Sequence, residues 1–229
     1  MSSAKRTSLT LTGALLLLAG IIAATLTTTE PEWWELYFSR LGMTGDFSAM
    51  LFNGGAIMGG VSIASGGVMM RIWFLRSPLI ATKEQRRAAR VIPFFGVTLG
   101  LSLAGIGVFP LSVDKLAHDI SSNGMIVSFL SLLIAHRIYL RSLSRLLSVL
   151  AIITGSALVL SLGAMSFGLI NLTVFEAIGF TAILSWVHLL ETHVRSFAEA
   201  PESRRTANSQ QISLSPIWGT RKMALVSEA

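Results

Sequence analysis

Six apolar runs of roughly 20 residues each constrain this sequence more than any other feature. In helical form, at about 1.5 Å rise per residue, such a run matches the ~30 Å hydrocarbon core of a bilayer. Unpaired backbone N–H and C=O groups are too costly in hydrocarbon, and the runs lack the alternation of barrel strands. The sequence therefore predicts an all-α polytopic membrane protein, a bundle of six transmembrane helices at residues 8–28, 49–74, 91–110, 116–135, 146–168 and 173–194.

The composition agrees with a membrane protein and excludes several kinds of site. Hydrophobic residues make up 52% of the 229 residues and charged residues 13%, and the mean hydropathy is +0.66. No cysteine is present, which rules out disulfides, thiolate metal ligands and cysteine nucleophiles. The net charge of +6 does not indicate a nucleic-acid partner, because the basic residues lie in short segments between the apolar runs.

Lys and Arg gather on alternate connections between the runs, and this pattern predicts the orientation. Of the 18 Lys and Arg residues, all but Arg40 and Lys115 fall on the side that also holds both termini. Cytoplasmic loops of membrane proteins are enriched in Lys and Arg, so we expect both termini in the cytoplasm and a multi-pass protein of the plasma membrane. The opposite, outer side carries Glu30, Glu32, Glu35, Asp46, Asp114, Asp119 and Glu176.

The two ends of the chain need separate interpretation. Lys5 and Arg6 before an apolar stretch also have the form of a cleaved signal peptide, with small residues at Ala23 and Ala24. The apolar core is longer than the 7–15 residues of a signal sequence, so we expect the first run to be retained. Residues 198–229 are polar and rich in Ser, Arg and Glu, which predicts a flexible cytoplasmic tail after a membrane domain of residues 1–197.

Glycines and aromatic residues give two further structural predictions. Gly55 and Gly59 in the second run, and Gly96 and Gly100 in the third, have the four-residue spacing that lets helices pack closely in lipid. The same glycines would also clear space for a substrate, an alternative that the sequence leaves open. The outer loop at residues 30–47 contains Trp33, Trp34, Tyr37 and Phe38, and we expect a short amphipathic helix at the membrane interface.

The segment between the third and fourth runs holds the most chemistry. If the fourth helix begins near Asp114, then Asp114, His118 and Ser122 share one face, with Ser121 beside them. A carboxylate one turn before His118 would hold its imidazole and let it titrate near neutral pH. The alternative is structural: Asp114 caps the helix, His118 lies at the headgroup level, and Ser122 packs against another helix.

Three more polar residues fall on the same outer side, namely Arg40, Asn53 and Glu176. Polar groups this close to hydrocarbon usually turn inward and find partners. We therefore expect Arg40 to reach Asp119 or Glu176 and pin the outer loop over the bundle. Together these residues form a predicted outer polar cluster of Arg40, Asn53, His118, Asp119 and Glu176.

A second polar set, at the cytoplasmic ends of the fourth and sixth runs, raises the question of a metal. His188 and His193 are five residues apart, about 140° around a helix, whereas a chelating pair needs spacings of three or four. His118 belongs to the opposite face of the membrane. No nucleotide-binding loop, zinc-protease motif or nucleophile elbow occurs either. We therefore expect no metal and no cofactor.

Three short motifs carry a family resemblance. They are Phe38-Ser-Arg-Leu-Gly42, Phe52-Asn-Gly-Gly55, and Gly107-Val-Phe-Pro110 followed by His118-Asp119. On these motifs, most of residues 8–195 resembles the bacterial and archaeal membrane family called domain of unknown function 998, and more distantly the DRAM-type autophagy modulators. The resemblance implies a six-helix bundle that shares the outer polar cluster. The DRAM-type proteins are linked to lipid distribution, which favours lipid handling.

Three functions stay open at this point. The first is a non-enzymatic protein that binds membrane lipids or regulates a membrane complex, with a partner protein or a second copy of itself and no nucleic acid. The second is an intramembrane lipid hydrolase, so that enzymatic activity stays an open alternative. The third is a small transporter or channel, for which the mid-membrane residues offer little polar lining. The candidate catalytic residues are His118, Asp119, Asp114 and Ser122, with Ser121 as the other possible nucleophile.

Overall fold

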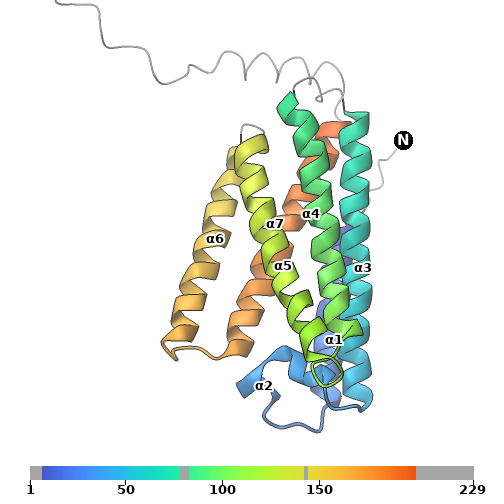
Figure 1. Ribbon diagram of the computed structural model, residues 1–229, viewed down its shortest axis with the longest axis vertical. Coiled ribbons are helices and arrows are strands. Elements are labelled where there is room, and N and C mark those ends of the chain that lie inside the picture. The colour runs from blue at the N-terminus through green and yellow to red at the C-terminus, as the bar shows by residue number, and fades with distance from the viewer. Residues whose placement is uncertain (1–6, 78–82, 142–143, 200–229) are drawn as a thin grey trace, which may run out of the picture. The chain divides into compact units, whose positions relative to one another are not determined.

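A computed structural model describes residues 7–77, 83–141 and 144–199, and six long helices account for most of them (Figure 1). All six are long and apolar enough to cross a membrane, so the protein is an integral membrane protein. The predicted tail lies outside the described residues from residue 200 onward. The long helices are α1 (Leu9–Thr27), α3 (Phe47–Arg76), α4 (Lys83–Val108), α5 (Lys115–Ala135), α6 (Arg145–Ser166) and α7 (Leu172–Glu199).

Each predicted run falls on one helix, but α4 and α7 extend further than the runs. The helix α4 begins at Lys83, eight residues before the predicted start, because its first turns are charged and do not register as apolar. The predicted interfacial helix of the outer loop is only a turn, α2 (Trp33–Leu36), followed by a 3₁₀ turn, η1 (Phe38–Gly42). A π-helical turn, η2 (His136–Leu140), continues α5.

Side-chain caps fix where four of the helices begin. Ser8, Asp46, Asp114 and Ser144 each accept a hydrogen bond from the backbone N–H three residues later. These caps satisfy an amide that has no partner inside the helix. The apolar pattern predicts the helices, and the caps set their first residues.

Glycine seams hold α3 between α1 and α4. A Cβ atom at Gly20 of α1 would lie 2.8 Å from the Cα of Gly55, and one at Gly67 of α3 would lie 2.6 Å from the amide nitrogen of Val97. In lipid, where apolar faces gain little by leaving their solvent, small residues stabilise a bundle by allowing such backbone contact. The prediction that these glycines serve close packing is confirmed.

The helix α6 packs more loosely than the other long helices. About half of the most apolar window of α3 and of α4 is buried within the protein, against 17% for α6. In Figure 1, α6 lies at the edge of the bundle, away from α1 and α3. Most of the buried core residues therefore come from α3, α4, α5 and α7.

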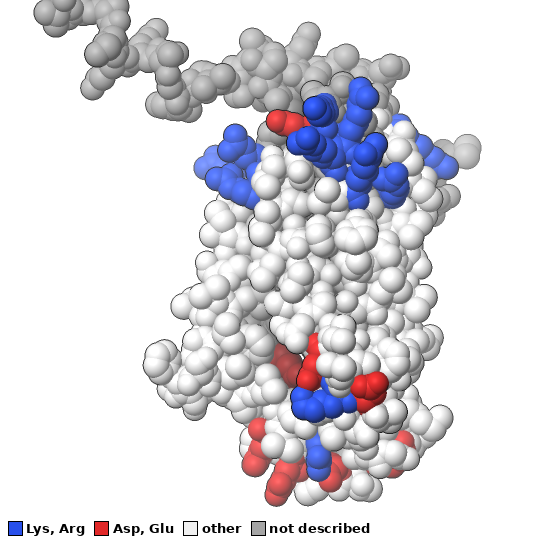
Figure 2. Space-filling view, viewed as in Figure 1, with Lys and Arg blue, Asp and Glu red and all other residues white. Residues whose placement is uncertain are grey.

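Charge separates the two ends of the bundle (Figure 2). Lys and Arg gather where α3 ends and α4 begins, which we call the basic end. Asp and Glu gather at the opposite, acidic end, where Arg40 and Lys115 also lie. Between these two bands the surface is almost free of charge, as the sequence predicts for the part within the bilayer.

Candidate functional site: a groove between α1 and α7

At the acidic end, Arg40 has a different partner from the one predicted. Its Nε lies 3.1 Å from Oε2 of Glu30, in an ion pair whose side chains are both about one-third exposed. The hydrogen bond to Glu30, and then its charge, raise the pKa of Arg40. Asp119 pairs instead with Lys115, one turn earlier on α5. The prediction that Arg40 reaches Asp119 or Glu176 is therefore wrong.

The outer loop is nevertheless held to α7, through its backbone. Oε2 of Glu176 accepts a hydrogen bond of 2.7 Å from the amide of Phe38, the first residue of η1. Such an amide has no partner within its own turn, so a carboxylate is a favourable acceptor. Close by, the side-chain amide of Asn171 donates to the carbonyl of Trp34 at 2.7 Å.

Asn53 holds the other end of the same turn. Its Nδ2 donates to the carbonyl oxygen of Gly42 at 3.1 Å. A Cβ atom on Gly42 would lie 2.9 Å from the ring of Phe52, so this close approach requires glycine. Asn53 thus joins the end of η1 to α3.

His118 is buried but forms no catalytic pair. Its Nδ1 lies 2.9 Å from the carbonyl oxygen of Phe109, just after α4. Asp114 caps α5 by accepting from the amide of Ala117, and the hydroxyl of Ser121 donates to the Ala117 carbonyl. The structural alternative for Asp114, that it caps the helix, is therefore confirmed.

The predicted outer polar cluster is thus distributed over separate contacts. Within the described part of the chain, Arg40, Asn53, His118, Asp119 and Glu176 have their side-chain contacts with other residues and not with one another. No hydrogen bond joins Ser122 to His118 there. These contacts position helix ends and the outer loop.

A denser polar cluster lies at the basic end, around Glu191 of α7. This carboxylate is 1% exposed and accepts three hydrogen bonds from the start of α1. Oε2 accepts from the hydroxyl of Ser8 at 2.9 Å and the amide of Thr10 at 2.8 Å, and Oε1 accepts from the amide of Leu9 at 3.0 Å. A carboxylate at a helix N-terminus also interacts favourably with the helix dipole.

The helix α3 makes room for this cluster. A Cβ atom on Gly66 would lie 3.3 Å from both Oε2 of Glu191 and Oγ1 of Thr10. The hydroxyl of Ser62 donates to the carbonyl of Leu9 at 2.8 Å, which ties α3 to the same turn. The start of α1 is therefore enclosed by α3 and α7.

His188 joins the cluster through Ser8. Nδ1 of the imidazole lies 2.8 Å from Oγ of Ser8. The single proton of the Ser8 hydroxyl is donated to Glu191, so Nδ1 must carry a proton and donate to Oγ. In the neutral imidazole, Nε2 is then an acceptor. No residue in the described part of the chain is hydrogen-bonded to Nε2.

This arrangement is not a hydrolytic triad, although it contains a serine, a histidine and an acid. In a triad the histidine lies between the other two groups and removes the serine proton. Here the hydroxyl lies in the middle, donates a hydrogen bond to Glu191, and belongs to a residue that is only 4% exposed. The cluster is suited to fixing the imidazole and not to attacking a substrate.

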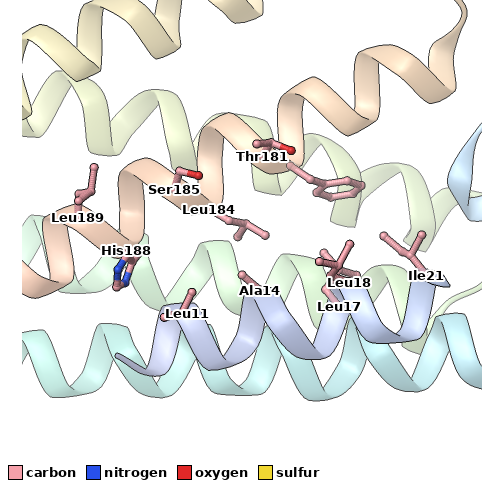
Figure 3. Close-up of a pocket in the computed structure, with 11 residues that line it drawn as sticks. Leu11, Ala14, Leu17, Leu18, Ile21, Thr181, Leu184, Ser185, His188 and Leu189 are labelled. Carbon is pink, nitrogen blue, oxygen red and sulfur yellow. The ribbon is translucent and has the colours of Figure 1, made fainter. Parts of the chain in front are cut away.

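A cavity of about 360 Å³ extends from His188 along the seam between α1 and α7 (Figure 3). Its walls are almost wholly apolar, and its rim includes the exposed residues Leu18, Thr181 and Ser185. The groove therefore opens sideways on the membrane-spanning surface. The residues that line it are Leu11, Ala14, Leu17, Leu18 and Ile21 from α1, and Phe180, Thr181, Leu184, Ser185, His188 and Leu189 from α7.

The sequence pointed to some of these residues but not to the groove. His188 and Glu191 are recognisable as polar residues in an apolar run, and Ser8 has the position of a helix cap. Ser8 and Glu191 are 183 residues apart in the chain, and nothing local indicates that they meet. Among the described residues, no group of three or more His, Cys, Asp or Glu side chains is arranged to hold a metal ion.

The groove, its polar end and the outer loop all fall within or beside one family match. Residues 11–193 match the family described as "Protein of unknown function (DUF998)". The chain belongs to this family. The DUF998 match covers both walls of the groove, together with His188 and Glu191, and begins three residues after Ser8. No curated protein and no solved structure matches the chain. The similarity to DRAM-type proteins stays a prediction.

Proposed function

We propose that this protein binds a membrane lipid, whose apolar chain lies in the groove between α1 and α7. The observation that carries this proposal is a cavity with apolar walls and a polar end, open sideways within the membrane-spanning part of the molecule. The solvent at that position is lipid. An apolar, concave site that faces hydrocarbon is suited to a hydrocarbon chain.

The position of the polar end gives the lipid an orientation. His188 lies near the start of α1, at the basic end, whereas Ile21 lies about 15 Å beyond Leu11 along α1 at ~1.5 Å per residue. The polar part of the lipid then meets His188, and the chain extends toward the acidic end. The basic end faces the cytoplasm of the cell in this proposal, because Lys and Arg are enriched on that side of membrane proteins.

Binding without catalysis is favoured over the hydrolase alternative. Among the described residues, no serine is hydrogen-bonded to the imidazole of His118, and the buried hydroxyl of Ser8 donates its hydrogen bond to Glu191. The polar end of the groove lies at the opposite end of the bundle from the predicted outer polar cluster. A purified protein that released fatty acid from lipids, and lost this turnover in His118→Ala, would contradict the proposal.

Blocking the groove tests the proposal directly. Ala14→Trp places an indole in the lining, while Ala19→Trp places the same side chain on the exposed face of the same helix. Native mass spectrometry of protein purified in mild detergent should detect bound lipid in the unmodified protein and in Ala19→Trp. We expect at least a tenfold loss in Ala14→Trp. Equal lipid content in all three proteins would overturn the proposal.

A further inference from the structure

We infer that the lipid in the groove is a neutral, single-chain lipid alcohol, whose hydroxyl donates a hydrogen bond to Nε2 of His188. This inference rests on the proposed function and names the chemical class of the ligand. At the end of the groove near the start of α1, the lining changes from hydrocarbon to the imidazole of His188.

The hydrogen bonds of Ser8 and His188 at this end of the groove leave an acceptor, so the ligand must supply a donor. The hydroxyl of Ser8 donates a hydrogen bond to Glu191. Its oxygen accepts hydrogen bonds from Nδ1 of His188 and the amide of Leu11. A neutral imidazole with its proton on Nδ1 presents an unprotonated Nε2. Because His188 lines the cavity and Nε2 has no partner within the described residues, a ligand with an O–H group supplies the missing donor.

Charge argues against the two ionic alternatives. A carboxylate or phosphate would oppose the lone pair of Nε2 and approach the carboxylate of Glu191, which is linked to the imidazole through one hydroxyl. An ammonium group would be a donor, but a charge inside the hydrocarbon region is costly without a counter-ion at contact distance. A neutral hydroxyl can donate a hydrogen bond to Nε2 without charge repulsion and without placing a charge in the hydrocarbon region.

The shape and the remaining polar groups of the groove agree with this class. A volume of about 360 Å³ is near the lower end of ligand pockets, which suits one chain. Ser185 and Thr181 precede His188 along α7 by three and seven residues, so they share its face. Their hydroxyls offer contacts to an ester or a second hydroxyl, as in a monoacylglycerol. A transmembrane helix of a partner, about 10 Å wide, exceeds the space.

A matched pair of ligands tests the inference. Oleyl alcohol and oleyl methyl ether share one chain, but the ether has no O–H group. Competition for the groove, followed by native mass spectrometry, should show about tenfold tighter binding of the alcohol. In His188→Phe, which keeps a ring without nitrogen, this preference should fall to about one. His193→Phe, the same substitution at a histidine of α7 that does not line the groove, is the control and should keep the preference.

A second measurement covers the case in which His188→Phe does not fold. With ¹⁵N-labelled histidine in the unmodified protein, the alcohol should shift one Nε2 resonance and the ether should not. Equal binding of alcohol and ether, with both lost in Ala14→Trp, would overturn the donor inference and leave lipid binding intact. Tighter binding of oleate than of the alcohol would also overturn it. Failure of every probe to bind would contradict the proposed function itself.

Discussion

The two faces of α1 show two ways to join helices in a membrane. Toward α3, the face contains Gly13, Gly20 and Ala24, and the backbones meet. Toward α7, the face contains Leu11, Leu18 and Ile21, whose bulk keeps the helices apart and leaves the groove. In lipid, where apolar surface gains little from burial, side-chain size at the seam decides between contact and cavity.

The seam between α1 and α7, which we call the open seam, is fixed at its two ends by the carboxyl groups of two glutamates. Glu191 accepts from the start of α1, and Glu176 accepts from the loop that follows α1. The two glutamates are 15 residues apart, or about 22 Å along α7 at ~1.5 Å per residue. The groove lies between them, so α7 is held in place without close backbone contact. The seam between α1 and α3, which we call the closed seam, is held by backbone contacts at its glycines. The open seam depends instead on the hydrogen bonds at its two ends.

Removing Glu191 should have the largest effect, because it breaks the open seam at its more buried end. Glu191→Ala leaves the hydroxyl of Ser8 and the amides of Leu9 and Thr10 without their acceptor. Hydrogen bonds to charged groups contribute about 1.5–3 kcal/mol each, so we expect a loss of about 3 kcal/mol or more. The free energy of unfolding in mixed micelles measures it.

Glu199→Gln is the matched control, since Glu199 is exposed at the end of the same helix. Its unfolding free energy should stay close to that of the unmodified protein. If Glu191→Ala lost no more stability than this control, the carboxylate would not hold the seam.

The closed seam predicts a second effect, of about 1–3 kcal/mol, from overpacking. In Gly20→Ala, the new Cβ would lie 2.8 Å from both the Cα of Gly55 and the carbonyl oxygen of Leu51, so the helices must move apart. Gly54→Ala is the control, because a Cβ there meets no atom within 4 Å. Removing a helical glycine at an open position should stabilise the protein by up to ~1 kcal/mol. Opposite signs in the two variants support the comparison, and equal signs contradict it.

These residues also show which parts of the structure the sequence can predict. The six helices follow from apolar runs, since hydrocarbon imposes the same requirement along each span. The partners of Arg40 and Glu191 do not follow, because they depend on how each helix is rotated about its axis. A capped start such as Asp114 is local and readable, whereas the meeting of Ser8 with Glu191 is a tertiary contact. The glycine seams are intermediate, because their spacing indicates contact but not the partner.

The acidic end of the open seam should respond more weakly. Glu176→Gln replaces the carboxyl acceptor for the amide of Phe38 with a carboxamide, and we expect a local loss of about 1 kcal/mol. Faster hydrogen exchange of the Phe38 amide would measure this loss, and the groove should keep its lipid. Glu35→Gln, an exposed substitution in the same loop, should leave the exchange rate unchanged. Equal rates in both variants would show that Glu176 does not hold the loop.

The smallest effect concerns the start of α3, the helix that carries the closed seam. The carboxylate of Asp46 accepts from the hydroxyls of Ser48 and Thr44, both at 2.6 Å, and from the amide of Ala49. These hydrogen bonds, that of Ser48 first, lower the pKa of Asp46 to about 2. The ordinary pKa of aspartate is about 3.9. Asp46 therefore stabilises the fold fully above about pH 4, and this stabilisation is lost as the pH falls to about 2.

Asp46→Asn isolates that dependence, because asparagine is also a good cap but does not titrate. The melting temperature of the unmodified protein should fall between pH 4 and pH 2 more steeply than that of Asp46→Asn. At pH 7 the variant should lack the charge-assisted hydrogen bonds and melt slightly lower. The groove lies away from this cap, along α1 and α7, so lipid content should be the same in both proteins. Parallel melting curves across this pH range would show that the carboxylate of Asp46 does not control the start of α3, and the closed seam would then rest on its glycines alone.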